Sequence, residues 1–105
     1  MNTQRPPPEF EPAVFVIDGP IRRDQIPDLC ARLRAFCDEA PGVELVCDVG
    51  LLGDPDAVAV DAMARLQLTA IRSERRIRFR GPCDQLGELI RMMGLRDALP
   101  LFDSS

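Results

Sequence analysis

Four carboxylates in the middle of the chain have the residue type and spacing that could support chemistry. Asp48 ends a predicted strand, and Asp54, Asp56 and Asp61 follow it closely. Carboxylate oxygens are the ligands that Mg²⁺ and Ca²⁺ prefer, but the spacing lacks the Gly and the terminal Glu of an EF-hand loop. An Asp directly ahead of an apolar helix accepts hydrogen bonds from the first backbone N–H groups. We therefore expect Asp56 to cap a helix, and we expect no metal site.

Arginines form a second group, which directly follows the acidic stretch. A run of guanidinium groups could bind phosphate or an acidic partner, or it could be a solvated helix end that complements the helix dipole. We favour the solvated end, because the whole chain is acidic and no aromatic side chains accompany the arginines. The six members are Arg65, Arg72, Arg75, Arg76, Arg78 and Arg80.

The four cysteines are Cys30, Cys37, Cys47 and Cys83. None of them forms a Cys-x-x-Cys pair, and the chain has no His to complete a mixed zinc site. The cysteines lie in apolar or strand-like stretches, so we expect reduced thiols that pack as small buried hydrophobic residues. No cofactor is expected.

The residue types that are missing exclude most catalytic chemistry. All 13 basic residues are Arg and 17 are acidic, so the net charge is 13 − 17 = −4, and the chain contains no Lys, His, Tyr or Trp. Schiff-base, Ser-His-Asp, Cys-His and P-loop lysine mechanisms are therefore impossible. Only carboxylates and thiols could move protons near neutral pH. The composition favours a binding protein over an enzyme, and the negative charge argues against a nucleic-acid partner.

The length of 105 residues is enough for one domain. Residues 1–12 are rich in proline and are interpreted as a flexible leader, and residues 13–105 as the domain. No stretch approaches the roughly 18 apolar residues of a membrane span, and the N-terminus has no apolar secretion signal. We expect a cytoplasmic protein with no membrane partner.

Strands and helices alternate along this domain. Apolar residues on both faces of Val43–Val49 predict a central strand, and the apolar residues from Leu95 to Phe102 are expected to fold back on the core. Such alternation favours an α/β fold with a parallel or mixed sheet and helices packed on it. The expected strands begin at Ala13, Val43 and Ile77, and the expected helices carry the apolar stripes Leu29–Cys37, Val60–Ile71 and Leu86–Met93.

Four segments, in this order and spacing, resemble the STAS domain of sulfate-transporter tails and bacterial anti-sigma factor antagonists. They are the strand Val43–Asp48, the helix Asp61–Leu68, the strand and turn Ile77–Pro82 and the ending Leu89–Leu95. The resemblance covers the chain from about Val14 to Phe102. It implies a mixed β-sheet with the helices mainly on one face, and a function of reversible binding.

In the antagonists of this family, a kinase-like anti-sigma factor phosphorylates a Ser or Thr in an Asp-Ser-Ser-Gly-like motif at a helix entry. The resemblance places Asp56 at the Asp of that motif and Ala57 at the phosphorylated position. A methyl group cannot accept a phosphoryl group. The resemblance therefore implies a regulatory protein that binds a protein partner, such as a kinase-like anti-sigma factor, but lacks the usual switch.

The binding surface that follows from this resemblance combines a turn after the first strand with the entry of the second helix. Two other functions remain open: binding of a nucleotide or lipid by the Arg65–Arg80 cluster and the apolar arc around Met63 and Leu66, and a homodimer formed through the same arc. The predicted partner-binding residues are Gly19, Ile21, Arg22, Arg23, Asp24, Asp54, Pro55, Asp56, Ala57, Val58, Ala59 and Asp61.

Overall fold

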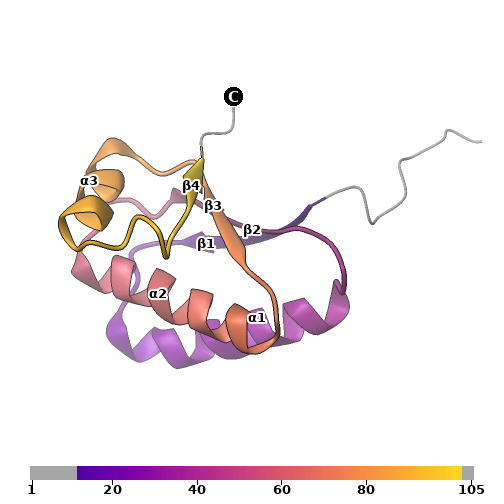
Figure 1. Ribbon diagram of the computed structural model, residues 1–105. Coiled ribbons are helices and arrows are strands. Elements are labelled where there is room, and N and C mark those ends of the chain that lie inside the picture. Colours follow the sequence, from indigo (N-terminus) through magenta and orange to yellow (C-terminus); the bar gives the residue numbers. More distant parts are fainter. Residues whose placement is uncertain (1–11, 103–105) are drawn as a thin grey trace, which may run out of the picture.

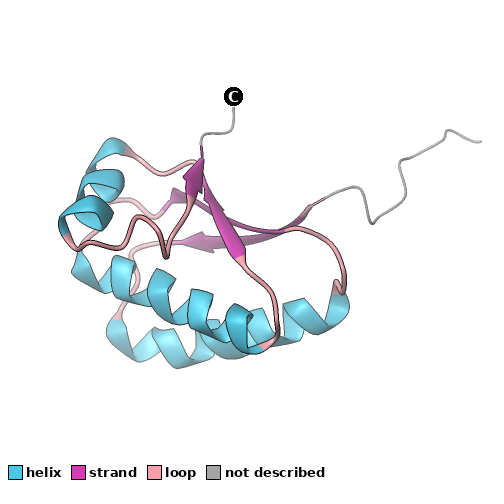
Figure 2. Ribbon diagram, in the orientation of Figure 1, coloured by secondary structure: helices cyan, strands magenta, loops and turns pink. Residues whose placement is uncertain are grey.

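The computed structural model describes residues 12–102 (Figures 1 and 2). The predicted leader, except Pro12, and residues 103–105 of the predicted domain lie outside this range. Strands and helices alternate as expected, with a short 3-10 helix before the first α-helix. The elements are β1 (Ala13–Asp18), the 3-10 helix (Arg23–Gln25), α1 (Ile26–Glu39), β2 (Leu45–Leu51), α2 (Ala57–Arg72), β3 (Ile77–Arg80), α3 (Asp84–Met92) and β4 (Leu101–Phe102).

The strands form one four-stranded sheet in the order β1-β2-β3-β4, and all three pairings are parallel. The α/β class is thus confirmed, and of the two expected sheet types the described strands adopt the parallel one. β2 is an inner strand, as its apolar residues on both faces predict. Because the strands stand in chain order, right-handed connections carry the helices to one face of the sheet, and Figure 1 shows α1 and α2 beneath that face.

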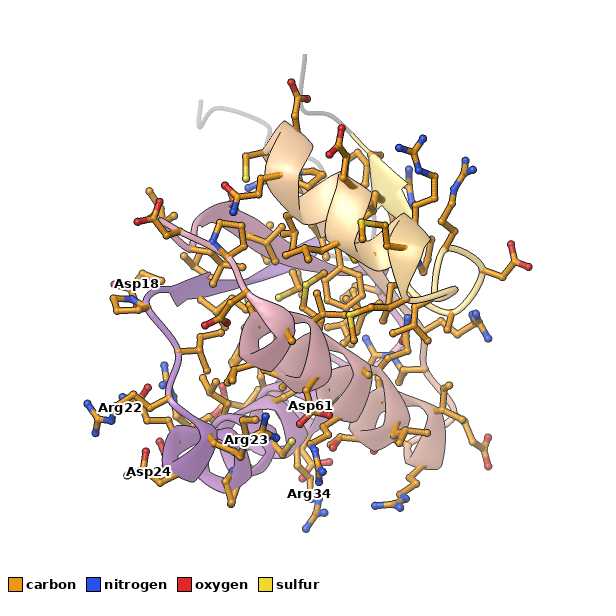
Figure 3. The ribbon with its side chains drawn as sticks, turned by 90° about the vertical axis from the view of Figure 1, so that its left-hand side faces the viewer. Asp18, Arg22, Arg23, Asp24, Arg34 and Asp61 are labelled. Atoms are coloured by element: carbon orange, nitrogen blue, oxygen red, sulfur yellow. The ribbon has the colours of Figure 1, made fainter. Side chains whose placement is uncertain are left out.

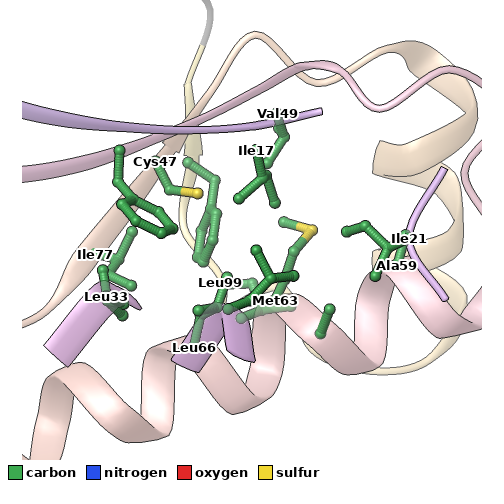
Figure 4. Packing of buried hydrophobic residues seen from close by; sticks show 14 of the residues in the cluster. Ile17, Ile21, Leu33, Cys47, Val49, Ala59, Met63, Leu66, Ile77 and Leu99 are labelled. Carbon is green, nitrogen blue, oxygen red and sulfur yellow. The ribbon is translucent and has the colours of Figure 1, made fainter. Parts of the chain in front are cut away.

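The core lies between this face of the sheet and the helices (Figure 4). Alternate strand residues such as Ile17, Cys47 and Phe79 point into it and meet Leu33 from α1 and Met63 from α2. The opposite strand residues lie on the second face of the sheet and do not belong to this cluster. The parallel sheet therefore has one face covered by helices and one face without a helix in residues 12–102.

Polar side chains fix the ends of the elements. Asp56 caps α2 as predicted, because its Oδ1 accepts a hydrogen bond from the Ala59 backbone N–H at 3.1 Å. Arg75 covers the C-terminal end of α1 by donating to the carbonyls of Cys37 at 3.3 Å and Val43 at 2.8 Å. The Asp56 contact is internal to α2, whereas the contacts of Arg75 join the end of α1 to the segments that lead into β2 and β3.

The segment after α3 returns to the core, as expected. Leu99 is fully buried, and Leu101 packs against the core cluster. β4 was not predicted from the sequence; it is only two residues long and pairs with the end of β3. The short strand completes the sheet at the edge opposite β1.

Candidate functional site

The two segments of the predicted binding surface leave the sheet side by side, at the carboxyl ends of β1 and β2. Parallel strands β1 and β2 end side by side, and their register joins Asp18 to Leu51. The Gly19 backbone N–H donates to the Leu51 carbonyl at 3.0 Å. A Cβ atom at Gly19 would lie 2.0 Å from the carbonyl oxygen of Leu52. The turn after β1 and the loop after β2 are thus in direct backbone contact, which only a glycine permits.

An ion pair connects the same two segments further out. Arg23 Nη1 donates to Asp61 Oδ2 at 3.1 Å, and the Asp61 carboxylate also accepts from Arg65 Nε at 3.2 Å. Figure 3 shows Arg23 and Asp61 on one side of the molecule, with Arg22 and Asp24 nearby. The structure therefore brings the segment 19–24 next to the beginning of α2.

Within this region some predicted residues are accessible and others are buried. Asp54, Asp56 and Ala57 are exposed at the entry of α2, and Val58 is half-buried. The exposed residues of the neighbouring turn are Arg22, Arg23 and Asp24. In contrast, Ile21, Pro55 and Ala59 are buried, so these three residues position the surface rather than form it.

The four carboxylates in the middle of the chain have different surroundings and do not form one site. Asp56 caps α2 and Asp61 bridges two arginines, as described above, while Asp54 is exposed. The Gly50 backbone N–H and the guanidinium of Arg80 both donate to Asp48, and these hydrogen bonds lower the pKa of its carboxyl group. Within residues 12–102, no three side chains of His, Cys, Asp or Glu come together in a way that could hold a metal ion.

The arginines that are close in sequence do not form one site. Arg75 binds the end of α1, Arg80 pairs with Asp48 at 2.9 Å, and Arg78 pairs with Glu44 at 2.6 Å while its guanidinium lies 4.1 Å from the Phe102 ring centroid. The prediction that they form a solvated helix end is therefore wrong for these three. Each of these three arginines contacts a different neighbouring segment. Because the chain turns between α2 and β3, arginines that are close in sequence do not share one surface.

The apolar arc proposed for a ligand or a second copy is not accessible. Met63 and Leu66 are fully buried against the sheet. The cysteines are free thiols, as expected, but only Cys37 and Cys47 are buried, while Cys83 is exposed just before α3. Burial raises the pKa of Cys47 to about 12, so this thiol remains neutral.

One feature of the molecule was not predicted from the sequence: arginines from α1 and α2 face a common groove. Arg34 and Arg72 both line it, although they are far apart in the chain. Only the alignment of the two helices brings them together, so the sequence offered no local signal for this groove.

No family model matches this chain, and no curated protein sequence matches it. Among the helices of residues 12–102, none is both long and apolar enough to cross a membrane.

Proposed function

We propose that this chain is a cytoplasmic, non-catalytic regulatory module that binds a protein partner, as STAS-type antagonists of anti-sigma factors do. The observation that supports the proposal most is the contact between the turn 19–24 and the entry of α2. Gly19 and Leu51 join them at the backbone, and Arg23 and Asp61 join them through side chains. Two loops fixed on a rigid sheet edge offer a preformed surface for a partner.

The chemistry of this surface favours binding without a phosphoryl switch. Ala57 is exposed at the N-terminus of α2, where the helix dipole would stabilise a phosphate, but its side chain carries no oxygen. Asp54 and Asp56 precede it closely in the chain and are both exposed. A kinase-like anti-sigma factor bound here could not release itself by phosphorylating this position.

Two exposed alanines allow a matched test of binding. The chain is co-purified with each kinase-like anti-sigma factor of the same genome, as wild type, as Ala57→Arg and as Ala35→Arg, which is exposed on α1. We expect one partner to bind the wild type and Ala35→Arg but not Ala57→Arg. If none of these partners binds, or if Ala57→Arg binds like the wild type, the proposal is wrong.

A gain-of-function variant tests the missing switch in the same complex. With ATP, the partner should leave position 57 of the wild type unmodified. Ala57→Ser restores a hydroxyl at the helix entry, and we expect its phosphorylation and the loss of the complex, read by intact mass and gel filtration. A wild-type chain that is phosphorylated on Thr69 or Ser73 and then dissociates would show that another switch operates.

A further inference from the structure

A groove of about 410 Å³ lies between α1 and α2, on the outer side of the helices. Its apolar part consists of Ile26, Pro27, Cys30 and Leu68, and the Leu68 side chain is 53% exposed although it lies in the middle of α2. Exposed apolar residues in a groove between helices are typical of sites that accept another apolar side chain.

The charges around this groove are strongly unbalanced. Four guanidinium groups and a single carboxylate, that of Asp61, line it, whereas the chain as a whole has a charge of −4. Asp61 pairs with Arg23 and Arg65 at one end. At the other end, Arg34 and Arg72 also line the groove, and neither takes part in an ion pair within residues 12–102. The groove therefore has two guanidinium groups available for an anionic ligand.

The alignment of the two helices places these two arginines level with each other. Arg23 contacts Asp61, and Arg75 contacts Cys37, so each contact joins residues 38 positions apart. The same offset relates Arg34 to Arg72, because 72 − 34 = 38. The helix dipole explains a cation in the last turn of α2, but it does not explain a second cation beside it that comes from α1.

The length of the groove indicates what would fit. It follows α1 from Ile26 to Arg34, which is about 12 Å, or two helical turns, along the axis. A single phosphate group would contact only one end. A peptide segment could place an apolar side chain on Leu68 and carboxylates against Arg34 and Arg72, where each planar guanidinium can donate two hydrogen bonds to a carboxylate.

We propose that the groove between α1 and α2 binds an acidic, amphipathic segment of another protein. Its apolar side chains lie on Cys30 and Leu68, and its carboxylates pair with Arg34 and Arg72. The site is separate from Ala57 and does not depend on the identity of the partner proposed above. It extends the binding surface along the outer side of the helices, with the pair of Arg23 and Asp61 at the boundary.

The test uses two labelled synthetic peptides of 16 residues with the same stripe of Leu, one with Glu and one with Gln on the polar face. Binding to the full chain is measured by fluorescence anisotropy and mapped by amide chemical shifts. We expect saturable binding of the Glu peptide, with shifts in α1 and α2, and binding of the Gln peptide that is at least about tenfold weaker. Binding should also weaken as salt is raised.

Three variants locate the interaction. Arg34→Glu with Arg72→Glu should weaken binding of the Glu peptide at least about tenfold. Arg76→Glu, which reverses an exposed charge away from the groove, and Ala57→Arg should each leave it within about twofold. The last variant separates this proposal from the proposed function, because it should abolish only the partner complex.

Several outcomes would overturn the proposal. They are equal binding of the two peptides, shifts confined to another face, and no loss of affinity in the double variant. Vesicles of phosphatidylserine and phosphatidylcholine are tested in parallel by sedimentation. If the chain binds these vesicles through Arg34 and Arg72 but does not bind the Glu peptide, the groove recognises a lipid surface instead.

Discussion

Asp48 joins two strands on the face of the sheet that lies opposite the helices of residues 12–102. Its Oδ1 accepts a hydrogen bond from the Gly50 backbone N–H at 2.9 Å, and its Oδ2 accepts one from Arg80 Nη2 at 2.9 Å. These donors favour the ionised form and hold the pKa of the carboxyl group below its usual value of 3.8. The carboxylate therefore stabilises the fold only while it is charged.

We expect Asp48→Asn to lower the free energy of unfolding by about 1 kcal/mol at pH 7, since the pair is partly exposed to solvent. A lowered pKa in the folded state contributes stability above the unfolded value, and this contribution is lost as the pH falls through the folded value. Urea unfolding at pH 7, 5, 3 and 2 should show the difference between wild type and variant shrink below pH 4. The exposed Asp97→Asn serves as the control. A difference that stays constant down to pH 2 would contradict this role.

The two cysteines Cys47 and Cys83 should differ strongly in reactivity. Thiolates are the reactive form, and burial, followed by the neighbouring Asp48, raises the pKa of Cys47 to about 12. Cys83 is exposed. We expect a thiol reagent at pH 8 to modify Cys83 in the native chain and Cys47 only after unfolding, as read by peptide mass. In Cys83→Ser, the fast phase of thiol modification should be reduced. Rapid modification of Cys47 in the native chain would contradict this prediction, because it would show that β2 is open to solvent.

At the scale of the elements, Gln67 connects α2 to the sheet and to the C-terminal segment. Its side chain is 98% buried, since only 2% is exposed. The amide nitrogen donates to the carbonyls of Ile77 and Ala98, both at 3.0 Å, and the amide oxygen accepts from the Ile77 backbone N–H at 2.8 Å. A single side chain thus satisfies three backbone groups from two segments.

Replacing this amide should leave those backbone groups without partners. We expect Gln67→Leu to lower the free energy of unfolding by about 3 kcal/mol and to accelerate hydrogen exchange at the Ile77 amide. Thr69→Val is the matched control, because the Thr69 hydroxyl donates only to the Arg65 carbonyl in its own helix; we expect a loss below about 1 kcal/mol. Equal losses in the two variants, measured by chemical denaturation, would argue against this connection.

Gly19 controls the distance between the two loops of the proposed binding surface. A Cβ atom there would clash with the Leu52 carbonyl, so Gly19→Ala must displace one backbone segment, and we expect a loss of about 2–3 kcal/mol. At Gly87, in α3, a Cβ would meet nothing within 4 Å. Gly87→Ala should stabilise the chain by about 0.5–1 kcal/mol. Thermal unfolding compares the two variants, and a Gly19→Ala chain as stable as wild type would mean that the loops are not in close contact.

The sequence predicted the elements better than the contacts between them. Local signals such as the Asp56 cap and the stripe from Leu86 to Met93 act over one or two turns, so they located the helices. β4 was missed because two residues carry no periodic pattern. The shared groove of Arg34 and Arg72 depends on how α1 is aligned with α2, and no local pattern contains that alignment.

At the scale of the whole molecule, the helices cover one face of the sheet, so the two faces differ in their exposure to solvent. Ile17 points to the helices and is 2% exposed, whereas its neighbour Val16 lies on the other face and is 47% exposed. The ion pairs of Arg78 with Glu44 and of Arg80 with Asp48 lie on this second face. Such charged pairs make the face more polar than a face that packs against helices.

This difference predicts that substitutions at two adjacent positions of β1 will differ strongly in their effect on stability. Ile17→Lys buries a charge in the core, and we expect a loss of at least about 3 kcal/mol or failure to fold. Val16→Lys places its ammonium in solvent, in register with Asp48 on β2, so its stability should remain within about 0.5 kcal/mol of wild type. Sedimentation should give the monomer mass of 11.7 kDa for wild type and Val16→Lys at all concentrations. If the wild type is a dimer and Val16→Lys is a monomer, this face of the sheet forms the contact between two copies, because the variant differs from wild type only at this position of the face.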